Sequence, residues 1–548
     1  MKKLFIYIPF AMQFVATLLL LSVACVSSSE LPSGEMEGQW EWLSRTGIIY
    51  ALCVGLSLLF YFRKAENSQP DYAYAVVWAL IIIGGWEALF GLRQLYGFTY
   101  SNHSLFPLTG SFFNPGPYSG YLAMIFPMGL SEYFRLKECS KHSLPAKIGY
   151  YFVLIVLFLI FCALPAGMSR SAWLAAGTSS LFVTGYYCHW IDKLKVLWRW
   201  NRRRFISWGI LGLVCLAIGL ATLFYIKKDS ANGRLFMWKI SLHAIAEKPL
   251  AGHGPGGFHD AYGAAQEAYF ANGTYSEWEE HVAGSPEYAF NEYLQLAIEF
   301  GIPVLICFMT LVVFCFWRGL KKQRVGICGA ILSLAIFAFS SYPLQLPVFI
   351  ITLIVLLFSC VAGKRPLWLL LFSLAIGTWS VYLWRTNDYE ACKKWTHVRV
   401  LYNVGAYKSA NEEYAGLYSE LKDRKEFMFE YGRCLQKMNA YNASNQILQE
   451  ASLLTCDPMV FNLIGKNHQM KGEYNKAEEY FLRSVNRLPG RIYPYYLLAK
   501  LYAEPDFFQS DKFEYAARMV MEKEPKVQST AIKEMRDEIR QLQEEMAR

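Results

Sequence analysis

Residues 233–258 read GRLFMWKISLHAIAEKPLAGHGPGGF, and residues 287–305 read EYAFNEYLQLAIEFGIPVL. The first stretch and the start of the second belong to a polar segment, 227–290, that lies between two long apolar runs. A helix that spans a bilayer needs roughly 20 apolar residues, and the flanking runs are long enough. The sequence therefore predicts an all-α, polytopic membrane protein with one large extramembrane loop in mid-chain.

The composition supports this class. The chain has 548 residues, of which 54% are hydrophobic and only 18% are charged. Its net charge of +9 is concentrated in short connectors such as Arg202-Arg203-Arg204, which are typical topology determinants, so no nucleic-acid partner is predicted. Cysteines fall mostly inside apolar runs without CxxC or Cys/His spacing, so we expect no metal and no cofactor. Cys434 and Cys456 either pair in an oxidising compartment or remain buried thiols.

About eleven apolar segments are candidate membrane spans. They cover residues 4–25, 45–62, 73–92, 119–135, 147–166, 171–190, 206–226, 291–317, 325–342, 344–361 and 366–384. The first is either an uncleaved span or a signal peptide, and both interpretations leave residue 30 outside the cytoplasm.

Basic residues indicate the orientation. With Lys2 and Lys3 in the cytoplasm, every strongly basic connector falls on the cytoplasmic side, as the positive-inside rule requires. These connectors carry Arg63-Lys64, Arg135–Lys147, Lys193–Arg204, Arg318–Arg324 and Lys364-Arg365. The segment 227–290 and everything after Trp384 then lie on the other side. We expect a bacterial inner-membrane protein whose carboxy-terminal part is periplasmic.

Charge becomes dense after residue 384, which divides the chain into a membrane domain, 1–386, a domain over 387–510 and a charged helical tail, 511–548. Phe461, Gly465, Ala477 and Phe481 occupy positions of the 34-residue tetratricopeptide pattern, which recurs upstream. Gly465 and Ala477 should allow two helices to approach closely, while the two phenylalanines fill the space between repeats. This tetratricopeptide-like α-solenoid either docks a periplasmic protein or acceptor, or is a spacer.

Four outward-facing segments carry polar residues. The first contains Asn114 and Pro115, and the second is Ser169-Arg170-Ser171-Ala172-Trp173. On the residues alone, the first is a Pro/Gly turn and Arg170 either snorkels to the interface or binds an anion, since guanidinium stays charged and binds phosphate bidentately.

The third segment contains Arg234, Trp238 and a glycine-rich turn with Gly252, Gly254 and Gly256. The fourth contains Asn291 and Glu292 and leads to Glu299-Phe300-Gly301.

Taken in this order, the four segments resemble the O-antigen ligase/polymerase family of bacterial envelope enzymes. The resemblance covers roughly residues 100–305. It implies that Arg170 and Arg234 bind the diphosphate of a polyprenyl-linked glycan. It also makes Asn114, Pro115, Trp238, the three glycines and Asn291 motif positions.

The sequence departs from the family at Phe290, where the family has a histidine proposed as essential. Another group must then serve as base, and the nearby candidates are Glu287, Glu292 and His281. Glu292 is alternatively a helix cap, and His281 lies in an acidic run that is typical of a solvated loop.

The resemblance implies transfer of a glycan from undecaprenyl diphosphate to an acceptor, without a metal or cofactor. The activity we expect is O-antigen ligation onto lipid A–core. The alternatives are a polymerase with a glycan acceptor, an oligosaccharyltransferase with a protein acceptor, and a transporter or scaffold that has lost the base.

Overall fold

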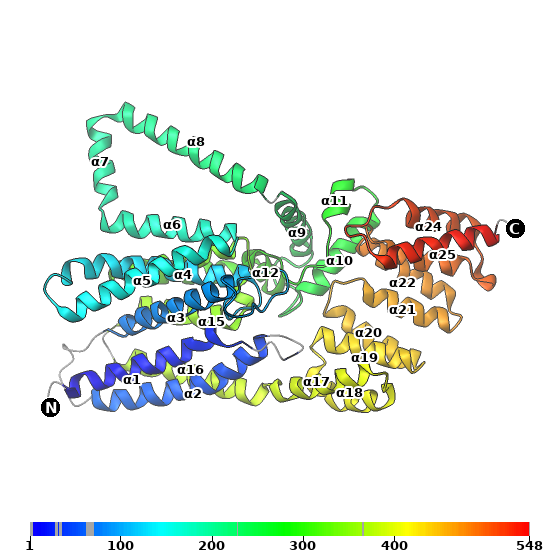
Figure 1. Ribbon diagram of the computed structural model, residues 1–548, viewed down its shortest axis with the longest axis horizontal. Coiled ribbons are helices and arrows are strands. Elements are labelled where there is room, and N and C mark those ends of the chain that lie inside the picture. The colour runs from blue at the N-terminus through cyan, green and yellow to red at the C-terminus, as the bar shows by residue number, and fades with distance from the viewer. Residues whose placement is uncertain are drawn as a thin grey trace. The chain divides into compact units, whose positions relative to one another are not determined.

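The computed structural model describes residues 4–27, 31, 35–61, 71–226, 228–363 and 366–546 (Figure 1). All regular secondary structure in these ranges is helical, which confirms the predicted all-α class. The basic residues Lys2, Lys3, Arg63, Lys64, Lys364 and Arg365, on which part of the predicted topology depends, lie outside the described residues.

The chain divides into two compact units. The first comprises Met1–Ile226, Phe290–Glu292 and Ile306–Glu390, and the second comprises Lys227–Ala289, Tyr293–Leu305 and Ala391–Arg548. The division near residue 390 lies close to the change in charge density. The polar segment 227–289 belongs to the same unit as the carboxy-terminal residues.

The first unit consists mainly of apolar helices, most of which pack together as a bundle. Its elements are α1 (Leu4–Leu21), η1 (Ser22–Cys25), α2 (Glu35–Tyr61), α3 (Tyr72–Leu95), α4 (Pro115–Cys139), α5 (Leu144–Ala166), α6 (Arg170–Tyr187), α7 (Trp190–Trp200), α8 (Arg202–Ile226), α14 (Val325–Ala338), η2 (Pro343–Gln345), α15 (Pro347–Val361) and α16 (Pro366–Thr386).

Five helical segments among the described residues are long and apolar enough to cross a membrane, which supports the multi-pass class. They are Ile8–Cys25, Tyr72–Leu95, Leu144–Ala166, Ile302–Lys321 and Pro366–Asn403. Two shorter apolar helices, Val325–Ala338 and Pro347–Val361, accompany them.

The segment expected as one span over 291–317 is broken in two. α12 (Glu292–Phe300) ends before Gly301, and α13 (Ile302–Lys321) begins after it. Gly301 has φ +84°, a left-handed conformation that interrupts a right-handed helix. The backbone N–H of Ile302 donates to the carbonyl oxygen of Pro249 at 2.8 Å, outside the helical ladder.

The second unit begins with three helices in the mid-chain segment, α9 (Lys228–Glu247), α10 (Phe258–Ala271) and α11 (Glu277–Val282). Its carboxy-terminal part is a series of short helices, in which each α-helix from α18 onward packs against the next α-helix in the chain. They are α17 (Tyr389–Asn403), α18 (Tyr407–Leu421), α19 (Lys425–Lys437), α20 (Tyr441–Leu453), α21 (Met459–Met470), α22 (Tyr474–Arg487), α23 (Ile492–Tyr502), η3 (Pro505–Phe507), α24 (Ser510–Glu522) and α25 (Thr530–Met546).

Close helix packing in this series follows the residues that the sequence singled out. A Cβ on Gly465 would lie 2.4 Å from Cε1 of Phe481, so only glycine permits this approach of α21 to α22. Ala477 and Phe481 are fully buried. The predicted close approach of two helices at Gly465 is confirmed. Assignment of the series to the tetratricopeptide class stays a prediction.

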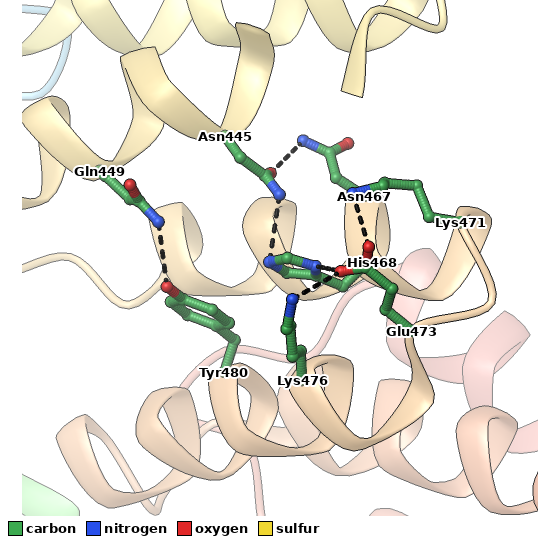
Figure 2. A network of polar contacts seen from close by, with 8 residues as sticks. All are labelled: Asn445, Gln449, Asn467, His468, Lys471, Glu473, Lys476 and Tyr480. Carbon is green, nitrogen blue, oxygen red and sulfur yellow. Dashed lines mark hydrogen bonds and ion pairs between the residues drawn. The ribbon is translucent and has the colours of Figure 1, made fainter. Parts of the chain in front are cut away.

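A polar network joins α20, α21 and α22 (Figure 2). Nδ2 of Asn467 donates to Oδ1 of Asn445 at 2.7 Å, and Nδ2 of Asn445 lies 3.2 Å from Nε2 of His468. Nδ1 of His468 lies 2.7 Å from a carboxylate oxygen of Glu473 and donates a hydrogen bond to it. Nε2 therefore accepts from Asn445, and the network fixes the register of the three helices.

α10 packs on α22, so the mid-chain segment is joined to the helical series. The side chain of Arg487 is only 3% exposed, and its Nη2 lies 3.0 Å from Glu267 on α10. Arg483 pairs with the same carboxylate at 2.8 Å. Gln266 donates to the carbonyl oxygens of Arg487 at 2.6 Å and Gly284 at 3.1 Å.

Candidate functional site

The glycine-rich turn is a left-handed loop in the second unit. Gly252, Gly254 and Gly256 have φ values of +67°, +94° and +71°, a region that side-chain-bearing residues rarely adopt. The loop connects α9 to the start of α10.

The loop is held by the Glu299-Phe300-Gly301 motif of α12. The backbone N–H of His253 donates to the carbonyl oxygen of Ile298 at 2.8 Å, and that of Gly254 donates to the carbonyl oxygen of Glu299 at 2.9 Å. The carboxylate of Glu299 accepts from the N–H of Gly256. Two motifs that are about 45 residues apart in the chain are thus one structural element.

Two glycines permit this contact. A Cβ on Gly301 would lie 2.2 Å from the carbonyl oxygen of Leu250, and one on Gly252 would lie 2.4 Å from that of Glu299. Both obstacles are backbone atoms, which cannot rotate away. The glycines are therefore required by the close approach of two backbones.

His253 connects the loop to α9, since its Nε2 lies 2.9 Å from the carbonyl oxygen of Ala244. α9 buries Phe236 and Ile240 in a core shared with Phe258 of α10. Arg234 and Trp238 lie on the same helix and are half-buried. The third predicted segment is therefore a rigid assembly of α9, the glycine loop and α10.

Glu287 lies beside a histidine that sequence reasoning missed. Oε1 of Glu287 is 3.9 Å from Nε2 of His259, and its Oε2 is paired with the ammonium group of Lys425. Burial and the positive charge of Lys425 lower the pKa of His259 to about 4, so its imidazole is neutral at pH 7. The one sequence signal was its place directly after Gly257-Phe258.

His281 is an exposed residue of α11. This short helix is fixed by a capping box in which Ser276 and Glu279 bond each other's backbone N–H groups. Glu279 also pairs with Lys239 at 2.5 Å. Burial opposes ionisation of Glu279, but the hydrogen bonds from Lys239 and Ser276 lower its pKa to about 2. The carboxylate of Glu279 is therefore ionised and has a structural role, since it fixes α11 and binds Lys239 of α9.

In the first unit, Asn114 caps α4, since its Oδ1 accepts from the N–H of Gly116 at 2.9 Å, and Pro115 is the first helical residue. Sequence reasoning missed the two side chains of α3 that hold the preceding turn. Glu87 accepts from the N–H and Oγ of Ser111 at 3.0 and 2.9 Å. Gln94 accepts from the N–H of Gly110 at 2.7 Å and donates to its carbonyl at 2.9 Å.

Arg170 is the first residue of α6. It follows Met168, which has φ +47°, in a sharp reversal after α5. The indole N–H of Trp173 donates to the carbonyl oxygen of Leu164 at 2.7 Å and so fastens α6 to the end of α5. Arg170 and Arg234 belong to different compact units, and their convergence stays a prediction.

Phe290, Asn291 and Glu292 also belong to the first unit. Phe290 has φ +48° and its ring meets Tyr342 edge-on at 5.1 Å. Asn291 is buried. Glu292 is 1% exposed, and its two oxygens accept from the N–H of Leu344 at 2.6 Å and Nε2 of Gln345 at 3.1 Å. These bonds give Glu292 a positioning role at η2, which precedes α15.

These features define a multi-pass helical membrane protein with a glycine loop fastened by a Glu-x-Gly motif. Residues 155–309 are similar to the family model described as "O-Antigen ligase". The match includes Arg170, Arg234, the glycine loop and Gly301, and it confirms the predicted resemblance over this part of the chain. Among curated proteins, none matches this sequence.

Proposed function

We propose that this protein transfers a glycan from undecaprenyl diphosphate to an acceptor at the periplasmic face of the inner membrane, with lipid A–core as the acceptor. The observation that carries the proposal is the O-antigen ligase match over 155–309, whose glycine loop is an ordered element docked on Glu299.

Arg170 and Arg234 are assigned to the donor diphosphate. The departing diphosphate gains negative charge as the glycosidic bond breaks, and fixed guanidinium groups stabilise that charge more in the transition state than in the ground state. Each arginine is located on a helix that other contacts fasten, α6 through Trp173 and α9 through His253. Such preorganisation is what electrostatic catalysis requires.

A gene deletion tests the function. Loss of the protein should leave unligated long glycan chains on the lipid carrier and a lipid A–core without them, and expression of the wild-type chain should restore ligation. Lipopolysaccharide that carries single repeat units identifies a polymerase instead. Unglycosylated periplasmic proteins with normal lipopolysaccharide identify a protein oligosaccharyltransferase. An unchanged glycan profile in all three assays rejects transferase activity.

A further inference from the structure

We propose that His259 accepts the proton of the acceptor hydroxyl, with Glu287 opposite it and Lys425 holding Glu287 in place. This inference rests on the proposed function, because it assigns the base of that same transfer. Transfer to a hydroxyl needs a group that takes up its proton.

The geometry separates the two imidazole nitrogens. Nδ1 of His259 is buried and has no hydrogen-bond partner among the described residues. Nε2 faces Glu287 at 3.9 Å, and the two side chains are 18% and 45% exposed. Nε2 is therefore the nitrogen that meets an incoming hydroxyl, with the carboxylate of Glu287 on the same side of the ring.

The position of His259 is fixed by the backbone around it. It is the second residue of α10, directly after the glycine loop, and its neighbour Phe258 is buried in the core of the unit. The loop in turn is held by Glu299. A base needs this kind of fixed placement, because proton transfer depends on hydrogen-bond distance.

Burial and, to a smaller extent, the positive charge of Lys425 keep the imidazole neutral. Lys425 is the first residue of α19. Its ammonium group pairs with Glu287 and lies 3.7 Å from the carboxylate of Glu426. Several other charged groups near α10 pair with one another. Arg483 and Arg487 of α22 pair with Glu267 of α10, and Lys239 of α9 pairs with Glu279.

The proposed step balances as follows. Nε2 of His259 takes the hydroxyl proton as the acceptor oxygen forms a bond to the anomeric carbon of the glycan. The bond from that carbon to the phosphate oxygen breaks, and its electron pair leaves with undecaprenyl diphosphate. The imidazolium ion then returns its proton to solvent past the exposed carboxylate of Glu287.

The test uses the full-length chain in proteoliposomes with undecaprenyl-diphosphate-linked glycan and lipid A–core. Binding of radiolabelled undecaprenyl diphosphate is measured in parallel. His259→Ala and His259→Gln should lower kcat by about 100-fold or more and leave carrier binding unchanged. Glu287→Gln should lower kcat about 10-fold. His397→Ala, which changes an exposed histidine of α17 in the same unit, is the matched control and should transfer normally.

The pH profile separates a base from a merely structural histidine. The wild-type rate should be flat down to about pH 5, since the pKa of His259 lies near 4. Lys425→Met removes the smaller of the two causes that lower this pKa and leaves the larger one, burial, in place, so the acid limb should move to higher pH without reaching the ordinary value of a histidine. In the double variant that carries both Lys425→Met and His259→Gln, this shift of the acid limb should be absent.

Unchanged kcat in both His259 variants overturns the assignment, and so does an equal loss of kcat and carrier binding. An acid limb that stays in place in Lys425→Met also overturns it. Absence of transfer by the wild-type chain is a different result, since it overturns the proposed function itself.

Discussion

The backbone N–H of Gly254 donates a 2.9 Å hydrogen bond to the carbonyl oxygen of Glu299, the last glutamate before the break in the helical segment at Gly301. This bond explains why a glycine-rich turn and a Glu-x-Gly motif occur together. Each supplies the backbone groups that the other leaves unpaired, and burial makes an unpaired group costly.

We predict that Gly301→Ala disrupts this junction. The new Cβ would lie 2.2 Å from the carbonyl oxygen of Leu250, and the alanine backbone would have to keep φ +84°. The free energy of unfolding should fall by about 3 kcal/mol or more, and glycan transfer should be lost. The control is Gly273→Ala, at φ +68° with open space around it, which should cost only about 1 kcal/mol. Unfolding in detergent, followed by tryptophan fluorescence, distinguishes the two; equal losses contradict the steric explanation.

The arginine assignments are tested by substitution. Arg170→Ala and Arg234→Ala should each reduce transfer about 100-fold, or about 3 kcal/mol of transition-state stabilisation. Lysine should restore activity only in part, because it lacks the planar bidentate fork. The measurement is transfer in cells at equal membrane abundance of each variant. Wild-type transfer by both alanine variants would exclude a diphosphate clamp.

Because α10 packs on α22, we predict that the carboxy-terminal helices are required for the ordered structure of the mid-chain segment 227–289. Arg487→Met removes a buried partner of Glu267 and should destabilise the unit by about 3 kcal/mol. Arg483→Met, which removes the more exposed partner of the same carboxylate, should cost about 1 kcal/mol or less. Limited proteolysis reads out the difference as cleavage within 227–289. If both variants are as resistant as wild type, the two segments are not energetically coupled.

The pKa of His259 has a consequence for stability. Because the folded pKa is about 4, below the ordinary 6.5, the unfolded chain binds more protons between these values. The contribution of neutral His259 to the free energy of unfolding is fully present above about pH 6.5 and is lost as the pH falls toward 4. At pH 5 the loss is about 2 kcal/mol. In His259→Gln, the decrease in the free energy of unfolding between pH 7 and pH 5 should be smaller by about that amount. An unchanged slope means that other groups dominate.

The predicted orientation can be tested with single cysteines in a cysteine-free background. Cysteines at positions 273 and 437 should react with a membrane-impermeant maleimide once the outer membrane is opened, because both belong to segments predicted to be periplasmic. A cysteine at position 199, in a basic connector, should stay unlabelled. Labelling of 273 or 437 only after lysis of the inner membrane contradicts the topology.

Sequence reasoning succeeded where the signal is local. Apolar runs indicated the helices, and Gly465 and Phe481 indicated a tight helix pair that the structure contains. It failed where a contact joins distant segments. Nothing near Glu287 in the sequence shows that His259 and Lys425 surround it. The break at Gly301 was missed because hydropathy does not report backbone conformation, whereas φ +84° decides it.

Gln266 donates to the carbonyl oxygen of Arg487, a partner 221 residues later in the chain. During synthesis the ribosome must therefore deliver most of the chain before this amide finds its acceptor. Until then the face of α10 that packs on α22 stays uncovered. Docking of α10 on α22 is thus a late event, and a nascent chain stalled before residue 487 lacks it however well its membrane helices have inserted.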